Sequence, residues 1–190
     1  MILIIDFGSQ FNQLIARRVR ECQVYCQIEP PHISVHAIRK LNPQGIILSG
    51  GPSSIYAQNS PKIDKAIFDL GLPVLGICYG MQFMIATLGG TVNKARKREY
   101  GFAELRIKKE TGLFKGLPAH TVCWMSHGDS ITKLPRGFQS TATTDNTNYA
   151  ATANPRKRLY GVQFHPEVEH TPKGRIILRN FLFDVCGCKR

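Results

Sequence analysis

The chain has 190 residues, a formal net charge of +12 and 43% hydrophobic residues. This length suits one domain, residues 1–190, with a sizeable core, and no apolar stretch is long enough to cross a bilayer. The chain opens on a short apolar run without a basic leader, so we expect a strand there, no signal peptide and a cytoplasmic protein. The six cysteines follow neither a disulfide framework nor a zinc-site spacing, which predicts reduced thiols.

In the first half of the chain, short apolar runs alternate with amphipathic segments. This alternation predicts a parallel sheet covered by helices on both faces. The expected strands cover residues 2–5, 24–28, 45–48 and 74–77, and the expected helices cover residues 11–21, 34–41, 62–70 and 81–88. Ligands of such sheets bind at the carboxyl ends of the strands, where both the Gly50-Gly51 loop and Cys78 fall.

After Gly90 the pattern changes to short strands punctuated by Gly, Pro, Asn and Asp. We expect these strands to be antiparallel and to form either an added edge of the first sheet or a second, smaller sheet. They cover residues 91–94, 101–107, 121–125, 130–134, 138–143, 149–153 and 159–164, and a last helix covers residues 173–185. The predicted fold class is α/β, with a central, mostly parallel sheet covered by helices and a smaller antiparallel sheet.

The strand at 74–77 leads through Gly76-Ile77-Cys78-Tyr79-Gly80 into a helix. A nucleophile at a tight turn between a strand and a helix is the elbow arrangement of many hydrolases. The flanking positions of such a turn need to lack a Cβ because backbone approaches backbone there. The amino end of a helix also favours a thiolate on Cys78. The alternative interpretation is a small, buried and unreactive cysteine.

A nucleophilic cysteine needs a base, and the base needs a group that orients it. His165 follows the strand at 159–164. Glu167 lies two residues later, and in an extended chain it points the same way and can reach the imidazole. The other histidines lack such a partner, and three of them lie in polar connecting stretches where we expect surface positions: His32, His36 and His120.

Two further segments are candidates for the site. Elbow enzymes take one oxyanion donor from the residue after the nucleophile, here Tyr79, and one from a loop after a neighbouring strand, here Gly51. Backbone donors of this kind lower a barrier by about 3–4 kcal/mol each. The alternative for Gly50-Gly51 is a plain turn. The second segment, residues 125–129, is predicted as a turn between two strands, and its composition is too specific to ignore.

The positive charge is concentrated in three runs, at residues 94–98, 106–109 and 156–158. Such runs form either a solvated surface or a basic face for nucleic acid, a nucleotide or an acidic protein. No helix-turn-helix, zinc finger or array of stacking aromatics accompanies them, so we expect no nucleic-acid partner.

Five separated motifs together resemble the class I, or triad, glutamine amidotransferases, and in particular the amidotransferase part of GMP synthetases. The motifs are Ile5 to Gln10, Ser49 to Pro52, Gly76 to Gln82, Met125 to Asp129, and His165-Pro166-Glu167. The resemblance covers essentially the whole chain and implies a flavodoxin-like architecture. Anthranilate-type members usually carry Leu, His and Ser at the positions that are occupied here by Tyr79, Met81 and Val168.

The resemblance implies an enzyme, the amidotransferase subunit of a glutamine-hydrolysing GMP synthase. Cys78 would attack the side-chain amide of glutamine, with His165 and Glu167 completing a catalytic triad and the Gly51 and Tyr79 N–H groups holding the oxyanion. Family members bind glutamine through the positions of Gly51, Gln82 and the segment Ser126 to Asp129, which includes Gly128. We expect no cofactor or metal in this chain.

The ammonia acceptor in this family is XMP, activated by ATP and Mg²⁺ in a synthetase unit. The chain stops at Arg190 without room for such a unit, so we expect the partner to be a separate ATP-pyrophosphatase subunit. This two-chain organisation resembles the archaeal form. The basic runs are the expected docking face for the partner. Three alternatives remain at this point: an amidotransferase subunit of another synthase, such as the anthranilate type, a non-catalytic regulatory protein on the same scaffold, and a free glutaminase that needs no partner.

Overall fold

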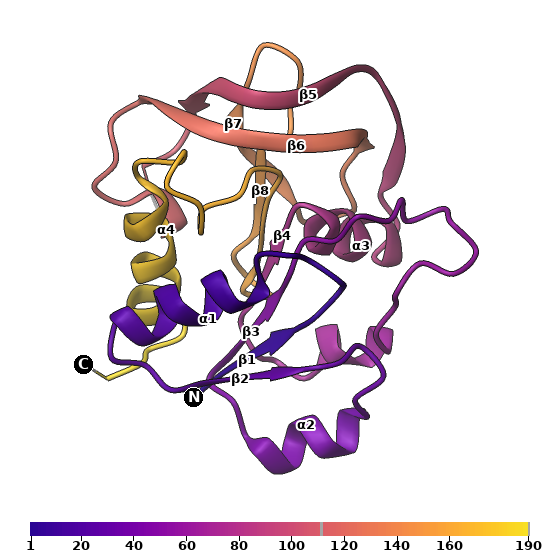
Figure 1. Ribbon diagram of the computed structural model, residues 1–190, viewed down its shortest axis with the longest axis vertical. Helices are drawn as coiled ribbons and strands as arrows, with labels where there is room; N and C mark the ends of the chain where they lie inside the picture. Colours follow the sequence, from indigo (N-terminus) through magenta and orange to yellow (C-terminus); the bar gives the residue numbers. More distant parts are fainter. Residues whose placement is uncertain (111, 190) are drawn as a thin grey trace.

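The computed structural model describes residues 1–110 and 112–189, apart from the side chains of Arg96 and Lys97, and is built on one nine-stranded sheet (Figure 1). The strand order is β2-β1-β3-β4-β9-β8-β7-β5-β6. The first five strands in this order are parallel, and their order is that of flavodoxin-like folds. Their bounds are β1 (Ile2–Ile5), β2 (Cys26–Glu29), β3 (Gly45–Leu48), β4 (Val74–Ile77) and β9 (Leu159–Val162).

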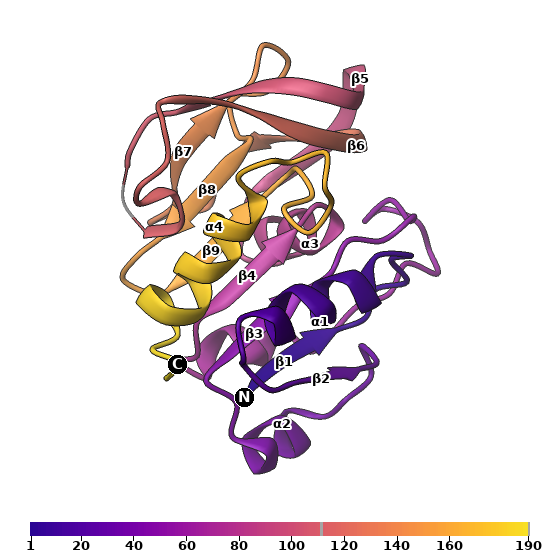
Figure 2. The ribbon, with the colours of Figure 1, turned by 60° about the vertical axis from the view of Figure 1, so that its left-hand side comes forward.

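Helices cover both faces of the parallel strands, as the alternating pattern predicts. On one face, Ile2 and Ile4 pack in a core with α1 and α4, which lie side by side in Figure 2. On the other face, Leu3 and Ile5 pack in a core with α2, η1 and α3. The bounds are α1 (Asn12–Glu21), α2 (Val35–Leu41), η1 (Lys65–Asp69), α3 (Tyr79–Thr87), α4 (Gly174–Asn180) and η3 (Phe181–Val185), a π-helical turn that continues α4. No helix in the described ranges is long and apolar enough to cross a membrane.

The antiparallel strands extend the same sheet, so of the two arrangements left open by the sequence, the added edge is the one observed. β8 (Ala151–Asn154) pairs with β9 and with β7 (Gln139–Thr143). β7 then pairs with β5 through Arg106 and Ile107, and a short 3₁₀ turn, η2 (Gly112–Phe114), follows β5. The long strands β5 and β6 form a ribbon across one end of the molecule (Figure 1).

The prediction of four short strands in this ribbon is wrong. Residues 91–107 form one strand, β5 (Thr91–Ile107), and residues 120–133 form another, β6 (His120–Lys133). The expected turn at residues 125–129 lies inside β6, because the extra residues are on the facing strand, β5. Lys94 pairs with Asp129 and Glu99 pairs with His127, which leaves a bulge in β5 between Lys94 and Glu99. A bulge bends one strand without ending the pairing.

The helix predicted at residues 62–70 is shorter than expected. Only the 3₁₀ helix η1 forms, with the Asp64 side chain accepting a hydrogen bond from the Ala66 N–H at its start. Gly71, at φ +70°, follows directly after Leu70. The apolar spacing of this segment is helical, but only residues 65–69 form a helix, and short isolated helical pieces commonly adopt 3₁₀ geometry.

Candidate active site

Cys78 stands at the elbow that the sequence predicts. It is the N-cap of α3, directly after β4, with a φ of 50° and a ψ of −109°. Such a backbone costs a non-glycine residue about 1–3 kcal/mol. The flanking glycines permit the turn: a Cβ on Gly76 would lie 2.6 Å from the Met81 backbone nitrogen, and a Cβ on Gly80 would lie 2.4 Å from the Leu48 carbonyl oxygen.

His165 and Glu167 reach Cys78 because β9 pairs with β4. Val162 ends β9 beside Ile77, and its carbonyl oxygen accepts the Cys78 N–H at 2.8 Å. The next residues of the chain therefore pass over the elbow. His165 Nδ1 lies 2.7 Å from Glu167 Oε1, and both side chains are buried. The predicted base and its orienting carboxylate are thus in contact with each other and next to the predicted nucleophile.

Neighbouring groups decide the charge of the His165 ring. Burial alone would lower the pKa of His165, but hydrogen bonds to Cys78 and Glu167, together with their negative charges, outweigh burial and raise the pKa to about 10. The imidazole is therefore protonated at neutral pH. A cationic ring beside a cysteine sulfur is a common feature of sites with a nucleophilic cysteine.

The loop that carries the base is anchored from three sides. The Trp124 carbonyl oxygen of β6 accepts the His165 N–H at 3.1 Å. Arg18 of α1 donates from Nε to the Glu167 carbonyl oxygen at 3.0 Å. The Phe11 ring packs edge-on against the His165 ring, with 5.5 Å between centroids. This support comes from β6, α1 and the loop after β1, so the imidazole is fixed by elements distant in the sequence.

The two predicted oxyanion donors line the same cavity as Cys78. Tyr79 is the first residue of α3, and the first N–H groups of a helix have no carbonyl partner within the helix. Gly51 lies in the loop after β3, where a Cβ would come within 2.5 Å of the Phe7 carbonyl oxygen. Because the Phe7 backbone occupies that space, position 51 has to lack a side chain.

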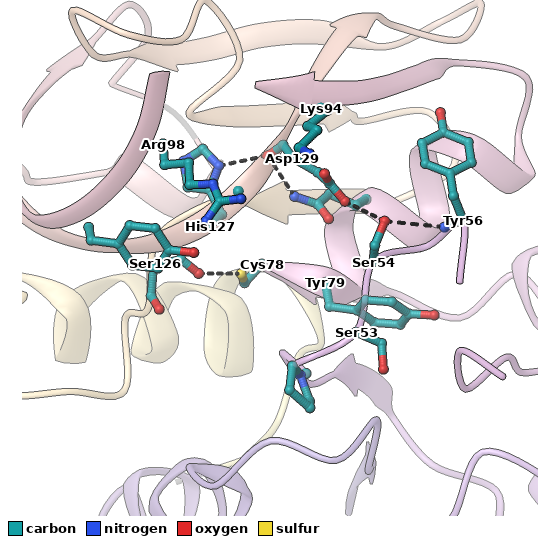
Figure 3. Close-up of a pocket in the computed structure, with 15 residues that line it drawn as sticks. Ser53, Ser54, Tyr56, Cys78, Tyr79, Lys94, Arg98, Ser126, His127 and Asp129 are labelled. Carbon is teal, nitrogen blue, oxygen red and sulfur yellow. Dashed lines mark hydrogen bonds between the residues drawn. The ribbon is translucent and has the colours of Figure 1, made fainter. Parts of the chain in front are cut away.

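A cavity of about 620 Å³ opens beside the elbow (Figure 3). This volume is in the range of small-molecule sites. All five residues predicted to bind substrate line it, namely Gly51, Gln82, Ser126, Gly128 and Asp129. The Ser126 carbonyl oxygen lies 3.5 Å from the Cys78 sulfur. Asp129 accepts a hydrogen bond from the Ser54 hydroxyl at 2.6 Å, as Figure 3 shows.

Several residues of the site escaped the sequence reasoning. Gln163 donates from Nε2 to the Cys78 sulfur at 3.6 Å, and its place two residues before His165 on an extended chain is a signal that alternation could have used. Lys94 and Arg98 line the cavity, although the sequence assigns them only to a basic run. Their position depends on the bulge in β5, which has no local signature.

The remaining histidines lie mostly outside the site. His32, His36 and His120 are exposed, which confirms the surface prediction. Within the described residues, no group of three or more His, Cys, Asp or Glu side chains could hold a metal ion.

The parallel sheet, the elbow cysteine and the imidazole–carboxylate pair together have the geometry expected of an elbow-type site with a cysteine nucleophile. The sequence profile of the class-I glutamine amidotransferases matches residues 3–185, and the chain belongs to this family.

Among its relatives, the glutamine-hydrolyzing GMP synthase of Heliobacterium modesticaldum is 58% identical over 98% of this chain and 36% of the relative. The GMP synthase of Brachyspira hyodysenteriae is 53% identical over 100% of this chain and 37% of the relative. The chain thus spans little more than a third of the length of these proteins. A crystal structure assigned to one subunit of a GMP synthase, from Thermoplasma acidophilum, has a TM-score of 0.88 and 33% identity, with 98% of this chain and 93% of that chain covered.

The close backbone contact at Gly80 gives a first prediction. Gly80→Ala should lower the free energy of unfolding by about 1–3 kcal/mol, because the new Cβ meets the Leu48 carbonyl in a packed elbow. Urea denaturation followed by circular dichroism measures the change. Thr87→Ala, at the half-buried end of α3, is the control and should stay within about 0.5 kcal/mol of wild type. Equal stability of Gly80→Ala and wild type would contradict the elbow geometry.

The charge of His165 gives a second prediction. NMR of the ¹⁵N-labelled imidazole should show a protonated ring throughout the neutral range and up to a midpoint near pH 10. Because Cys78 and Glu167 both raise this pKa, Cys78→Ala and Glu167→Gln should each move the midpoint to lower pH. A neutral His165 ring at pH 7 in the wild-type protein would show that the ion pair does not form.

Proposed function

We propose that this chain is the glutaminase unit of a GMP synthase, which releases ammonia from glutamine for a synthetase unit that converts XMP to GMP. The observation that carries the proposal is the convergence of Cys78, His165 and Glu167 at the carboxyl ends of β4 and β9, at the wall of a cavity that also exposes the predicted oxyanion donors. The relatives are named glutamine-hydrolyzing GMP synthases, and these names support XMP as the acceptor of the ammonia.

The first half-reaction forms a thioester. The Cys78 thiolate attacks the side-chain carbonyl carbon of glutamine, and the oxygen takes up negative charge beside the Gly51 and Tyr79 N–H groups. As the carbon–nitrogen bond breaks, the His165 imidazolium donates its proton to the departing nitrogen, which leaves as ammonia. Glu167 holds the ring in place through its Nδ1 contact of 2.7 Å.

The second half-reaction restores the enzyme. The imidazole is neutral after it has given up its proton, and it now takes a proton from a water molecule that attacks the thioester carbon. The carbon–sulfur bond breaks, glutamate leaves, and the thiolate–imidazolium pair is restored. The same ring thus acts first as an acid and then as a base, which requires that it stay beside the sulfur throughout.

A synthetase partner completes the proposal. ATP and Mg²⁺ would bind to that unit, with no cofactor held by this chain. The chain spans 36% and 37% of the two GMP synthases compared, which supports a further unit of about twice its size for the complete reaction. We expect the partner to be a separate subunit, in line with the structural similarity to a protein assigned as one subunit of a GMP synthase. The six free cysteines support a reducing, cytoplasmic location.

The basic runs are not equivalent as docking sites. Arg158 belongs to the run at 156–158, and its carbonyl oxygen accepts the Val74 N–H at the amino end of β4, opposite the end that carries Cys78. The run at 94–98 borders the cavity instead, through Lys94 and Arg98. The same strand then exposes Tyr100 and Phe102, whose exposed fractions are 64% and 66%. Because ammonia leaves from the cavity side, we place the synthetase unit against this part of β5.

Reconstitution tests the function. Wild-type protein with the synthetase subunit, XMP, ATP and Mg²⁺ should form GMP from glutamine. Cys78→Ala should abolish the reaction with glutamine and leave the reaction with ammonium salts intact, because only the ammonia source is lost. Chromatographic measurement of GMP distinguishes the cases. If wild-type protein formed no GMP from glutamine while ammonium salts did support synthesis, the proposed function would be wrong.

Charge reversal tests the docking surface. Replacing Arg96, Lys97 and Arg98 by Glu should weaken binding of the synthetase subunit by about tenfold or more in titration calorimetry, because a basic face would then meet its partner with the wrong sign. The side chains of Arg96 and Lys97 lie outside the described part of the structure, so the expectation rests on Arg98 and Lys94. The control reverses three exposed charges elsewhere, at Arg39, Arg156 and Lys157. Equal affinities of the two triple variants would remove the docking surface from β5.

A further inference from the structure

A buried imidazole–carboxylate pair that plays no part in the proposed mechanism lies at the cavity wall, where His127 lines the cavity. Glu99 of β5 and His127 of β6 are each 5% exposed, and His127 Nε2 is 3.1 Å from Glu99 Oε2. Burying polar or charged groups is costly unless each is hydrogen-bonded. One member of this pair, His127, belongs to the predicted glutamine-binding segment Ser126 to Asp129.

Both ends of the pair are fully bonded. His127 Nδ1 lies 2.7 Å from the Asp129 carbonyl oxygen, so both ring nitrogens have a hydrogen-bonding partner. Glu99 Oε1 accepts hydrogen bonds from the Thr144 hydroxyl at 2.9 Å and the Asn146 amide at 3.2 Å. Burial alone would raise the pKa of Glu99, but the hydrogen bonds from His127, Thr144 and Asn146 outweigh it and hold the pKa below its ordinary value.

The pair is one part of a continuous chain of hydrogen bonds that ends at the sulfur. The Asp129 carbonyl oxygen, which His127 contacts, also accepts from Gln82 Nε2 at 3.1 Å. Gln82 Nε2 lies 3.1 Å from Gln163 Oε1, and Gln163 Nε2 in turn donates to the Cys78 sulfur at 3.6 Å. Figure 3 shows the first of these links, from the His127 ring to Asp129.

Backbone pairing alone leaves this part of the cavity wall weakly fixed. The ladder between β5 and β6 shifts register between Lys94 and Glu99, so Gly128 lies opposite the bulge, between the paired residues His127 and Asp129. A glycine without a direct ladder partner is a flexible point in a strand. The pair of Glu99 and His127 ties the residues on both sides of Gly128 to β5, through the His127 side chain and the Asp129 carbonyl.

We infer that Glu99 and His127 are positioning residues, which hold the segment Ser126 to Asp129 in the shape that receives glutamine. The inference rests on the proposed function, because it concerns recognition of the same substrate. It assigns to the pair no contact with the reacting atoms. Loss of the pair should therefore weaken recognition of a glutamine analogue more than it changes the chemistry at the sulfur.

Inactivation by a diazoketone analogue of glutamine separates these effects, because the saturating rate kinact reports alkylation of Cys78 and KI reports recognition. Glu99→Ala should raise KI by about tenfold or more, because His127 loses its acceptor. The value of kinact should change by less than about threefold, because the pair does not contact the reacting atoms. Glu99→Gln should stay within about threefold of the wild-type KI, because its oxygen can still accept from Thr144 and Asn146 and its amide can donate to His127 Nε2.

A matched control removes a polar group that is remote from the cavity. Asn180 of α4 donates to the carbonyl oxygens of Leu113 and Lys115, so Asn180→Ala should lower the melting temperature and leave KI unchanged. If Glu99→Ala does not fold, His127→Gln serves the same purpose, since it can reach Glu99 but loses the ring nitrogen that contacts Asp129.

The outcomes distinguish the positioning role of Glu99 and His127 from the proposed function. A wild-type KI in a folded Glu99→Ala or His127→Gln variant, or an equal rise of KI in Asn180→Ala, would overturn the positioning role. A rise in KI as large in Glu99→Gln as in Glu99→Ala would also overturn it, because the hydrogen bonds would then not be what matters. Wild-type protein that resists the diazoketone, with and without the synthetase subunit, would instead overturn the proposed function.

Discussion

The parallel pairing of β4 with β9 is the constraint on which the site depends. It joins residues 74–77 to residues 159–162, which are separated by the whole ribbon of β5 and β6 and by β7 and β8. The Cys78 N–H closes this pairing on the Val162 carbonyl oxygen. As a result, a strained cysteine at the end of one strand lies beside the imidazole that follows the next strand. The rest of the sheet and its helices keep those two strand ends buried and in register.

Two features of the site cost free energy, and the surrounding structure offsets each of them. The strained backbone of Cys78 is held by close backbone packing around Gly76 and Gly80, and the buried charge of His165 is offset by Glu167 and the sulfur. The side chains of Glu99 and His127 are buried as well, and each offsets the burial of the other by hydrogen bonding. This pair lies farther from Cys78, where the bulge in β5 interrupts the regular ladder. In both places a buried imidazole between acceptors fixes a segment that backbone hydrogen bonds alone would leave loose.

The sequence predicted those features of the fold and site that follow from local rules. The elbow could be recognised because glycines flank Cys78 at the positions where a Cβ would clash. Glu167 could be recognised because residues two apart along an extended chain point to the same face. The continuous strands β5 and β6 could not be predicted, because their glycines suggest turns and the bulge forms only when the two strands pair. The contacts of Glu99 and Arg98 depend on that pairing as well, so they lie beyond local reasoning. The roles carried over from the family resemblance remain predictions.

The central claim is that the sulfur of Cys78 forms a covalent intermediate with glutamine beside His165. The most direct measurement is rapid acid quenching of the reaction with glutamine, followed by mass spectrometry of the peptide that contains Cys78. The account predicts a glutamyl thioester on Cys78 that appears before glutamate accumulates and is absent from Cys78→Ala. Steady release of ammonia from glutamine with no adduct on Cys78, or with an adduct on another cysteine, would contradict it.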